Sequence, residues 1–226
     1  GLTRASVGLP DNAVVLACFN NIYKITPGMF ACWLRILRRV PQAVLWLLDD
    51  NAPASAALRQ HAASAGIGPD RLKLAGRSTH AEYRERLTLA DIYLDTFPYN
   101  AGSTARDVVD AGLPMVTLSG QTMVSRMGLS ILTALGAQEN ATQSFEEYEN
   151  KVVELYLKKQ AGTLQRGYAS APALQVAQAL KQISGSAMQA TEKTIDSTPA
   201  VNLAASPRLQ VHHIVIGLVN LNWDLV

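Results

Sequence analysis

Residues 89–104 read Leu-Ala-Asp-Ile-Tyr-Leu-Asp-Thr-Phe-Pro-Tyr-Asn-Ala-Gly-Ser-Thr, and this stretch decides the fold. Its apolar run, Ile92–Asp95, predicts a short strand that is buried on both faces. Small and polar residues then form a turn, and Ser103 is expected to cap a helix that runs to about Ala111 and ends at Gly112. A buried strand that passes directly into a helix is the repeating unit of a parallel α/β sheet.

The same order of strand, turn and helix recurs along most of the chain. Other strand-like apolar runs occur at residues 13–19, 43–48, 72–75 and 115–118. Helical patterns follow at residues 26–37, 54–65, 79–89, 124–135 and 145–159. Helix start signals include Thr26 before Pro27 and the capping boxes of Thr79 with Glu82 and Ser144 with Glu147. We therefore expect an α/β fold with a Rossmann-like parallel sheet that helices cover on both faces.

The end of the chain lacks this pattern. We expect residues 1–165 to form the lobe, and residues 166–226 to form a C-terminal helix, near 171–183, followed by a poorly defined tail. Residues 184–207 are rich in Ser, Ala and Thr and are typical of a linker, and residues 211–221 resemble a strand without a partner. The chain begins at Gly1, not at a methionine, so we expect a piece of a longer protein.

Composition excludes several classes of protein. Of the 226 residues, 48% are hydrophobic and 17% are charged, which excludes a disordered chain. The net charge of +2 gives no global field for a nucleic acid or an acidic membrane. No apolar run reaches the roughly 20 residues of a membrane helix, and no signal peptide is present. The two cysteines have no metal-ligand spacing, so we expect a cytoplasmic protein without a metal site.

Ligands of an open parallel sheet bind beyond the carboxyl ends of its strands, where helix N-termini gather. After the first strand, Asn21 and Lys24 supply an amide and a cation for a phosphate. After the fourth strand, Gly102 allows close approach of the backbone, and the hydroxyls of Ser103 and Thr104 open the next helix. Together these two loops suit a nucleotide diphosphate.

Other polar residues extend this candidate site. Asp107 lies one helical turn beyond Ser103 and Thr104, where a carboxylate suits a ribose diol. Ser78 follows the third strand, and Tyr83 and Arg86 lie on the helix after it.

Each residue also has an ordinary structural explanation. Lys24 and Arg86 would then be solvated side chains, Ser103 and Thr104 a helix cap, Asp107 a complement to the helix dipole, and Tyr83 part of the core. No Gly-x-Gly-x-x-Gly follows the first strand, and no Gly-x-x-x-x-Gly-Lys occurs. These absences argue against a dinucleotide dehydrogenase and a phosphate-loop NTPase.

Four segments in this order resemble the C-terminal catalytic lobe of the protein O-GlcNAc transferase and SPINDLY family, especially its bacterial tetratricopeptide-repeat members. They are residues 19–27 (Phe-Asn-Asn-Ile-Tyr-Lys-Ile-Thr-Pro), 40–48 (Val-Pro-Gln-Ala-Val-Leu-Trp-Leu-Leu), 89–100, and 111–117 (Ala-Gly-Leu-Pro-Met-Val-Thr). The resemblance implies a GT-B glycosyltransferase, whose two Rossmann-like lobes enclose a donor nucleotide held mainly by the C-terminal lobe.

By this resemblance, Lys24 contacts the donor diphosphate and stabilises the UDP leaving group. The resemblance also places Asn21, Gly102, Ser103 and Thr104 on the phosphates, Asp107 on the ribose, and Ser78, Tyr83 and Arg86 around the uracil. The implied reaction is an inverting transfer of a sugar from a UDP-sugar, UDP-GlcNAc or a relative, to a protein Ser or Thr, without metal or cofactor. The implied partners are the acceptor protein, the missing N-terminal lobe and tetratricopeptide repeats.

The sequence also departs from the family. Animal members have His-Thr-Thr where this chain has Gly102, Ser103 and Thr104, so one side-chain donor is lost. The family's usual ending is missing after Lys159. Without its other lobe, the isolated chain is expected to be weak or inactive as a transferase. Two alternatives stay open: a GDP-fucose-dependent protein O-fucosyltransferase of the SPINDLY type, and a non-catalytic nucleotide-binding or scaffold module.

Overall fold

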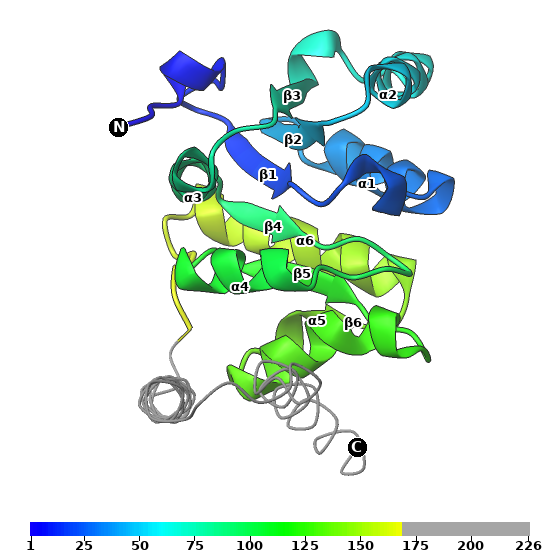
Figure 1. Ribbon diagram of the computed structural model, residues 1–226, viewed down its shortest axis with the longest axis vertical. Coiled ribbons are helices and arrows are strands. Elements are labelled where there is room, and N and C mark those ends of the chain that lie inside the picture. Colours follow the sequence, from blue (N-terminus) through cyan, green and yellow to red (C-terminus); the bar gives the residue numbers. More distant parts are fainter. Residues whose placement is uncertain (169–226) are drawn as a thin grey trace, which may run out of the picture. The chain divides into compact units, whose positions relative to one another are not determined.

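A computed structural model describes residues 1–168. Its sheet has six strands in the order β3-β2-β1-β4-β5-β6, and every neighbouring pair is parallel. The strands are β1 (Val14–Cys18), β2 (Ala43–Asp49), β3 (Leu72–Gly76), β4 (Ile92–Leu94), β5 (Met115–Leu118) and β6 (Ala141–Thr142). Figure 1 shows them from β3 near the top to β6 near the bottom. The prediction of a parallel α/β sheet is confirmed; the two-residue strand β6 was too short for its pattern to predict it.

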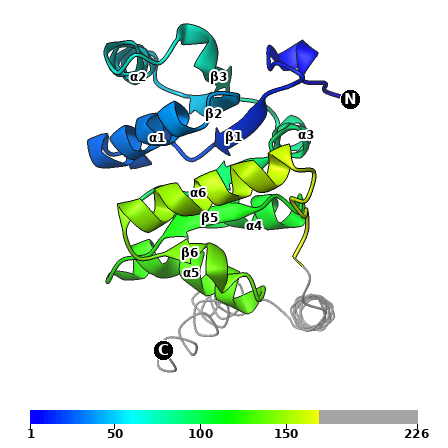
Figure 2. The same cartoon turned by 180° about the vertical axis from the view of Figure 1, so that it is seen from behind.

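Helices cover both faces of this sheet. They are α1 (Pro27–Arg39), α2 (Ala52–Ser64), α3 (His80–Leu89), α4 (Ser103–Asp110), α5 (Met123–Ala134) and α6 (Phe145–Gln160). The helices α1 and α6 lie on one face, in front of the sheet in Figure 2, and residues of α2 join the same core. Residues of α3, α4 and α5 pack on the opposite face. Because helices cover both faces, the sheet is accessible to a ligand at the ends of its strands.

The strand β1 shows why the strands are apolar at every position. Val14, Leu16 and Cys18 enter the core beneath α1 and α6, whereas Val15 and Ala17 enter the core beneath α3, α4 and α5. All five residues are buried. Successive side chains of a strand point to opposite faces, so a sheet between two helix layers needs apolar residues at both parities.

Polar side chains begin most of the helices. Thr26 accepts from the Met29 N–H ahead of α1, and Thr79 forms the expected capping box ahead of α3. Asn51 caps α2, which therefore begins two residues earlier than the alanine pattern predicts. At α6, Ser144 accepts from the Glu147 N–H, but the Glu147 carboxylate accepts from the Gln143 N–H, so only half of the predicted capping box forms.

The chain order of the sheet reverses between β1 and β4, which are hydrogen-bonded neighbours. On one side of this point the chain continues through β2 and β3, and on the other side it continues through β5 and β6. The loops after β1 and β4 therefore lead in opposite directions and leave a crevice between them. Short 3₁₀ turns complete the fold: η1 (Ala5–Val7), η2 (Ile22–Lys24), η3 (Pro69–Arg71) and η4 (Gln138–Asn140). Of these, η2 lies in the loop after β1 and carries Lys24 into the crevice.

The last described residues also pack on the lobe. The Arg166 guanidinium donates to the Ala90 carbonyl at 2.6 Å, and the Tyr168 hydroxyl donates to the Leu113 carbonyl at 2.8 Å. The division at residue 165 stays a prediction, and these contacts attach residues 166–168 to the lobe. The helix expected at 171–183, the linker at 184–207 and the strand at 211–221 lie outside the described residues.

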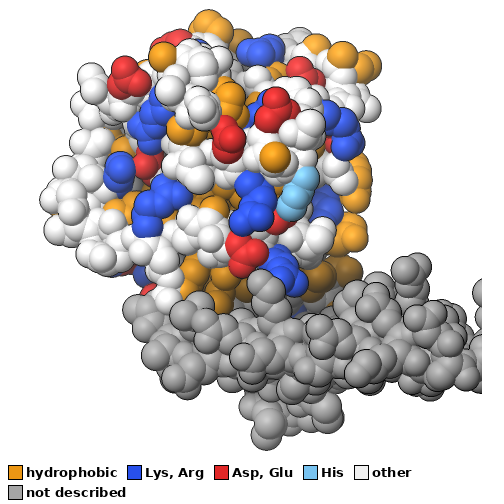
Figure 3. Space-filling model, turned by 60° about the vertical axis from the view of Figure 1, so that its left-hand side comes forward, with side chains coloured by type: hydrophobic (Ala, Val, Ile, Leu, Met, Phe, Trp, Pro, Cys, Tyr) orange, Lys and Arg blue, Asp and Glu red, His pale blue; other side chains and the backbone are white. Residues whose placement is uncertain are grey.

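Figure 3 shows basic and acidic side chains interspersed on the face it presents, in accord with the small net charge. None of the helices in the described part of the chain has the length and apolar character that a membrane crossing requires.

Candidate functional site

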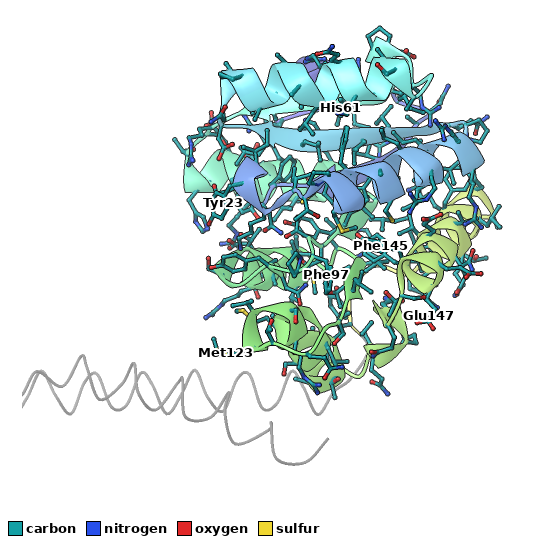
Figure 4. All side chains as sticks on the ribbon, turned by 90° about the vertical axis from the view of Figure 1, so that its right-hand side faces the viewer. Tyr23, His61, Phe97, Met123, Phe145 and Glu147 are labelled. Carbon is teal, nitrogen blue, oxygen red and sulfur yellow. The ribbon has the colours of Figure 1, made fainter. Side chains whose placement is uncertain are left out.

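A cavity of about 420 Å³ opens at the ends of β1 and β4. Its walls come from the loop after β1, the loop after β4 with the start of α4, and the start of α5. The lining residues are Phe19, Asn20, Asn21, Tyr23, Lys24, Tyr99, Gly102, Ser103, Thr104, Met123, Val124 and Met127. Figure 4 shows Tyr23 and Met123, from opposite walls, on the same side of the molecule. The structure therefore brings five predicted phosphate-site residues around one cavity: Asn21, Lys24, Gly102, Ser103 and Thr104.

Lys24 is held by the loop on the other side of the cavity. Its Nζ donates to the Asn100 carbonyl at 3.1 Å and lies 3.8 Å from the centroid of the Tyr99 ring. The turn that carries Lys24 is fixed by its own backbone, where the Lys24 N–H donates to the Asn21 carbonyl, and by the Asp50 carboxylate, which accepts from the Ile22 N–H at 3.4 Å. The explanation of Lys24 as a freely solvated side chain is therefore wrong.

The helix α4 begins differently from the prediction. Ser103 is its first helical residue, Gly102 is its N-cap, and no side chain caps it. The Ser103 hydroxyl is therefore not the expected cap. Because Gly102, Ser103 and Thr104 line the cavity, the first N–H groups of α4 and the positive end of its dipole are available to an anion there.

The loop from β4 to α4 is organised by a buried carboxylate that the sequence analysis did not single out. Asp95 accepts hydrogen bonds from the Thr96 N–H at 2.8 Å, the Ala101 N–H at 2.7 Å and the Thr117 hydroxyl at 2.7 Å. The Asn20 side-chain amide approaches it at 3.4 Å. Burial raises the pKa of Asp95 to about 6, and its hydrogen bonds oppose that rise. Asp95 thus fixes the backbone immediately before α4.

Two buried asparagines connect this loop to the sheet. The Asn20 side chain donates to the Thr96 hydroxyl at 2.8 Å, and the Asn100 side chain donates to the Thr96 carbonyl at 2.7 Å. The sequence did contain a signal for these residues, namely the polar residues that directly follow two apolar strands. Buried polar groups require hydrogen-bond partners, so such residues are expected to bind one another. These residues position the cavity wall; Asn20 also lines the cavity.

The four residues predicted for the nucleoside do not line the cavity. Asp107 lies one turn further along α4, and its carboxylate is 3.2 Å from His80 Nε2 on α3. Tyr83 is half-buried, packs edge-on against Phe19, and has a buried hydroxyl without a hydrogen-bond partner in the described residues. Arg86 donates to the Gly76 carbonyl at 2.6 Å, and Ser78 lies in the loop between β3 and α3. Phe19 is the link between this group and the cavity, since it lines the cavity and touches Tyr83.

Within residues 1–168, no group of three or more His, Cys, Asp or Glu side chains is arranged to hold a metal ion. The positive charge at the cavity comes from Lys24 and the N-terminus of α4.

Residues 2–168 match the family model described as glycosyl transferase family 41. Over 157 residues the chain is 39% identical to the probable UDP-N-acetylglucosamine–peptide N-acetylglucosaminyltransferase SEC of Arabidopsis thaliana, covering 69% of this chain and 16% of the relative. It is 35% identical to the UDP-N-acetylglucosamine–peptide N-acetylglucosaminyltransferase of Caenorhabditis elegans, covering 68% of this chain and 13% of the relative. The chain thus spans less than a fifth of the length of these relatives.

The Thermobaculum terrenum O-GlcNAc transferase (K341M mutant) has a similar fold. The TM-score is 0.61 at 24% identity, covering 80% of this chain and 38% of that one. The predicted fold class, a Rossmann-like lobe of the GT-B type, is confirmed. On the match over residues 2–168, this chain belongs to glycosyl transferase family 41.

Proposed function

We propose that this chain is the donor-binding C-terminal lobe of a protein O-GlcNAc transferase. The reaction would move N-acetylglucosamine from UDP-GlcNAc to a Ser or Thr hydroxyl of a protein, with inversion at the sugar and without a metal. The observation that carries the proposal is the shared cavity of Lys24 and the uncapped N-terminus of α4. Its family and the printed names of the two relatives support the choice of donor and acceptor.

Lys24 would bind the diphosphate and stabilise the leaving group. As the bond from the sugar to the diphosphate breaks, negative charge grows on the departing UDP. A fixed ammonium offsets that charge without having to reorganise, which lowers the barrier. Lys24 suits this role because Asn100 and Tyr99 already hold it at the cavity.

Asn21 and the start of α4 would hold the same diphosphate from two sides. The side chain of Asn21 provides an amide, and Ser103 and Thr104 provide hydroxyls and helix N–H groups. Gly102 adds no side chain, and a Cβ there would lie 3.2 Å from the end of the Met127 side chain, which would have to shift slightly to accept it.

The nucleoside would extend from the cavity past Phe19 toward α3. Asp107 is proposed to bind the ribose hydroxyls, exchanging its contact with His80 for a contact with the sugar. Ser78, Tyr83 and Arg86 are proposed to surround the uracil. The buried, unpartnered Tyr83 hydroxyl supports this assignment, because a buried donor normally has an acceptor.

Calorimetric titration of the 226-residue chain with UDP tests the proposal. Lys24→Ala removes a charge-assisted hydrogen bond, worth about 1.5–3 kcal/mol, and is expected to weaken binding by about 10- to 150-fold. Lys158→Ala is the matched control, because Lys158 lies at the far end of α6 and pairs with Glu154. Equal UDP affinity in the wild type and Lys24→Ala would remove Lys24 from the site.

Two alternatives have their own tests. A GDP-fucose donor, as in an O-fucosyltransferase, predicts that GDP displaces UDP from the chain with much higher affinity. A non-catalytic scaffold predicts no binding of either nucleotide at millimolar concentration. The names of both relatives contain UDP-N-acetylglucosamine, which favours UDP.

Transfer itself would need more than this lobe. The chain spans 16% and 13% of two relatives, and we propose that an N-terminal lobe, with tetratricopeptide repeats before it, completes the acceptor site. An assay of sugar transfer by the full-length protein tests this. The cytoplasmic location also stays a prediction, which fractionation of cells expressing the full-length protein checks.

A further inference from the structure

Within residues 1–168, the ammonium group of Lys24 contacts two groups of the loop after β4. One is the Asn100 carbonyl at 3.1 Å, and the other is the face of the Tyr99 ring at 3.8 Å from its centroid. Both are uncharged. Among the residues that the structure describes, no carboxylate forms an ion pair with Lys24. The ammonium is therefore held in place while its positive charge remains available to a ligand.

The number of donors on the ammonium leads to the same conclusion. A lysine ammonium has three N–H donors and no acceptor. One donates to Asn100, and the electron-rich face of Tyr99 attracts the cation from another side. The donor capacity that remains is for the cavity, which Lys24 and Tyr99 both line.

We propose that Tyr99 is a positioning residue for Lys24: its ring holds the ammonium in the orientation in which it meets the diphosphate of the ligand. This inference rests on the proposed function. A free lysine side chain loses rotamer entropy when a ligand orders it, and a protein that has already ordered the side chain binds more tightly. The Tyr99 ring pre-orders Lys24 in the absence of ligand.

The ring can be changed without disturbing the loop, because hydrogen bonds to the loop's backbone hold it. The Thr96 hydroxyl donates to the Tyr99 carbonyl at 2.6 Å, and the Asn100 N–H donates to the Val124 carbonyl at 2.9 Å. Tyr99 is 42% exposed, and its ring lies near the exposed ring of Tyr23, at a centroid distance of 6.4 Å. A substitution at Tyr99 is therefore expected to alter Lys24 and leave the fold intact.

A double-mutant cycle measured by UDP titration tests the inference. Tyr99→Leu keeps an apolar side chain but removes the ring, and it is expected to weaken UDP binding by about 3- to 20-fold. Tyr99→Phe keeps the ring face and is expected to recover most of that loss. In the Lys24→Ala background, Tyr99→Leu is expected to have no further effect. Equal losses in both backgrounds would overturn the inference, because Tyr99 would then act directly on the ligand or on the fold.

Two further measurements separate this inference from the proposed function. NMR of the ligand-free chain is expected to show ring-current shifts at the Lys24 side chain that vanish in Tyr99→Leu; unshifted Lys24 resonances in the wild type would overturn the inference. Repeating the cycle with inorganic pyrophosphate isolates the diphosphate. Binding of pyrophosphate but not UDP would defeat the proposed donor, and the pyrophosphate cycle would still decide the role of Tyr99. Binding of neither ligand would overturn both.

Discussion

The buried carboxylate of Asp95 offers the sharpest test of how the loop before α4 is built. Asp95→Ala leaves three close donors without an acceptor: the N–H groups of Thr96 and Ala101 and the hydroxyl of Thr117. Each unsatisfied buried donor costs about 1–3 kcal/mol. The substitution also removes the cost of burying the Asp95 charge, which offsets part of this loss in stability. A pKa raised from 3.8 to about 6 corresponds to about 3 kcal/mol at neutral pH. The net expectation is a loss of about 3 kcal/mol in the free energy of unfolding at pH 7.

Asp95→Asn is the matched control. Its side-chain oxygen can still accept from Thr96 and Ala101, and its amide can donate to the Thr117 hydroxyl, which accepts as readily as it donates. The asparagine therefore keeps the partners and removes the charge. We expect its stability to be close to that of the wild type near pH 4 and up to about 3 kcal/mol higher than that of the wild type at pH 7.

The pH dependence has a definite sign. The pKa of Asp95 is higher in the folded protein, about 6, than the ordinary value of 3.8. Between these values the folded state binds more protons than the unfolded state, so this group's contribution to stability is present below about pH 4. It is lost as the pH rises through 6. Relative to Asp95→Asn, the wild type should therefore lose stability, by up to about 3 kcal/mol, between pH 4 and pH 7.

Urea unfolding followed by circular dichroism, at intervals from pH 4 to pH 7, measures all three proteins. Equal stability of Asp95→Ala and the wild type at pH 7 would refute the structural role of the Asp95 carboxylate. Parallel pH profiles for the wild type and Asp95→Asn would equally refute the raised pKa.

Three further predictions concern packing, and urea unfolding checks each of them. Gly128→Ala places a Cβ against Thr117 and 2.8 Å from the Asp95 carboxylate, and should cost about 2–3 kcal/mol. Gly112→Ala should cost about 1 kcal/mol more than Gly66→Ala, since both have positive φ but only Gly112 meets other backbone, at 3.1 Å; equal losses would contradict this. Trp33→Ala empties a fully buried site and should cost about 3–5 kcal/mol, so a loss under 1 kcal/mol would contradict the assigned core.

The sequence was sufficient to predict five of the six strands and the crevice. Residues 14–18 and 43–49 are apolar at nearly every position because the sheet lies between two helix layers. Once the strands are parallel, the loops after β1 and β4 must open at the same edge. For this reason Lys24 and Ser103, which are 79 positions apart, could be expected in one cavity.

The helix starts were harder to predict where tertiary contacts decide them. A serine before a helical pattern favours a cap at Ser103. In the structure Asp95 instead binds the Ala101 N–H, which fixes the chain ahead of α4, and Gly102 becomes the N-cap. The sequence pattern around the start of a helix does not show that the Asp95 carboxylate, six residues before Ala101, will bind the Ala101 N–H.

The nucleoside side of the site was the least predictable from the sequence. Asp107 and Tyr83 lie on neighbouring helices, and each makes a contact within the protein, to His80 and to Phe19. Which of these contacts a ligand replaces depends on side-chain geometry across two helices, and spacing along one helix does not give it.

An NMR titration of the 226-residue chain with UDP and with uridine tests most directly whether two loops grip a diphosphate. The backbone amides of Asn21, Ser103 and Thr104 should shift together with a single dissociation constant for UDP, and uridine should bind at least tenfold more weakly. Shifts in only one of the two loops, or equal affinity for uridine and UDP, would contradict the account.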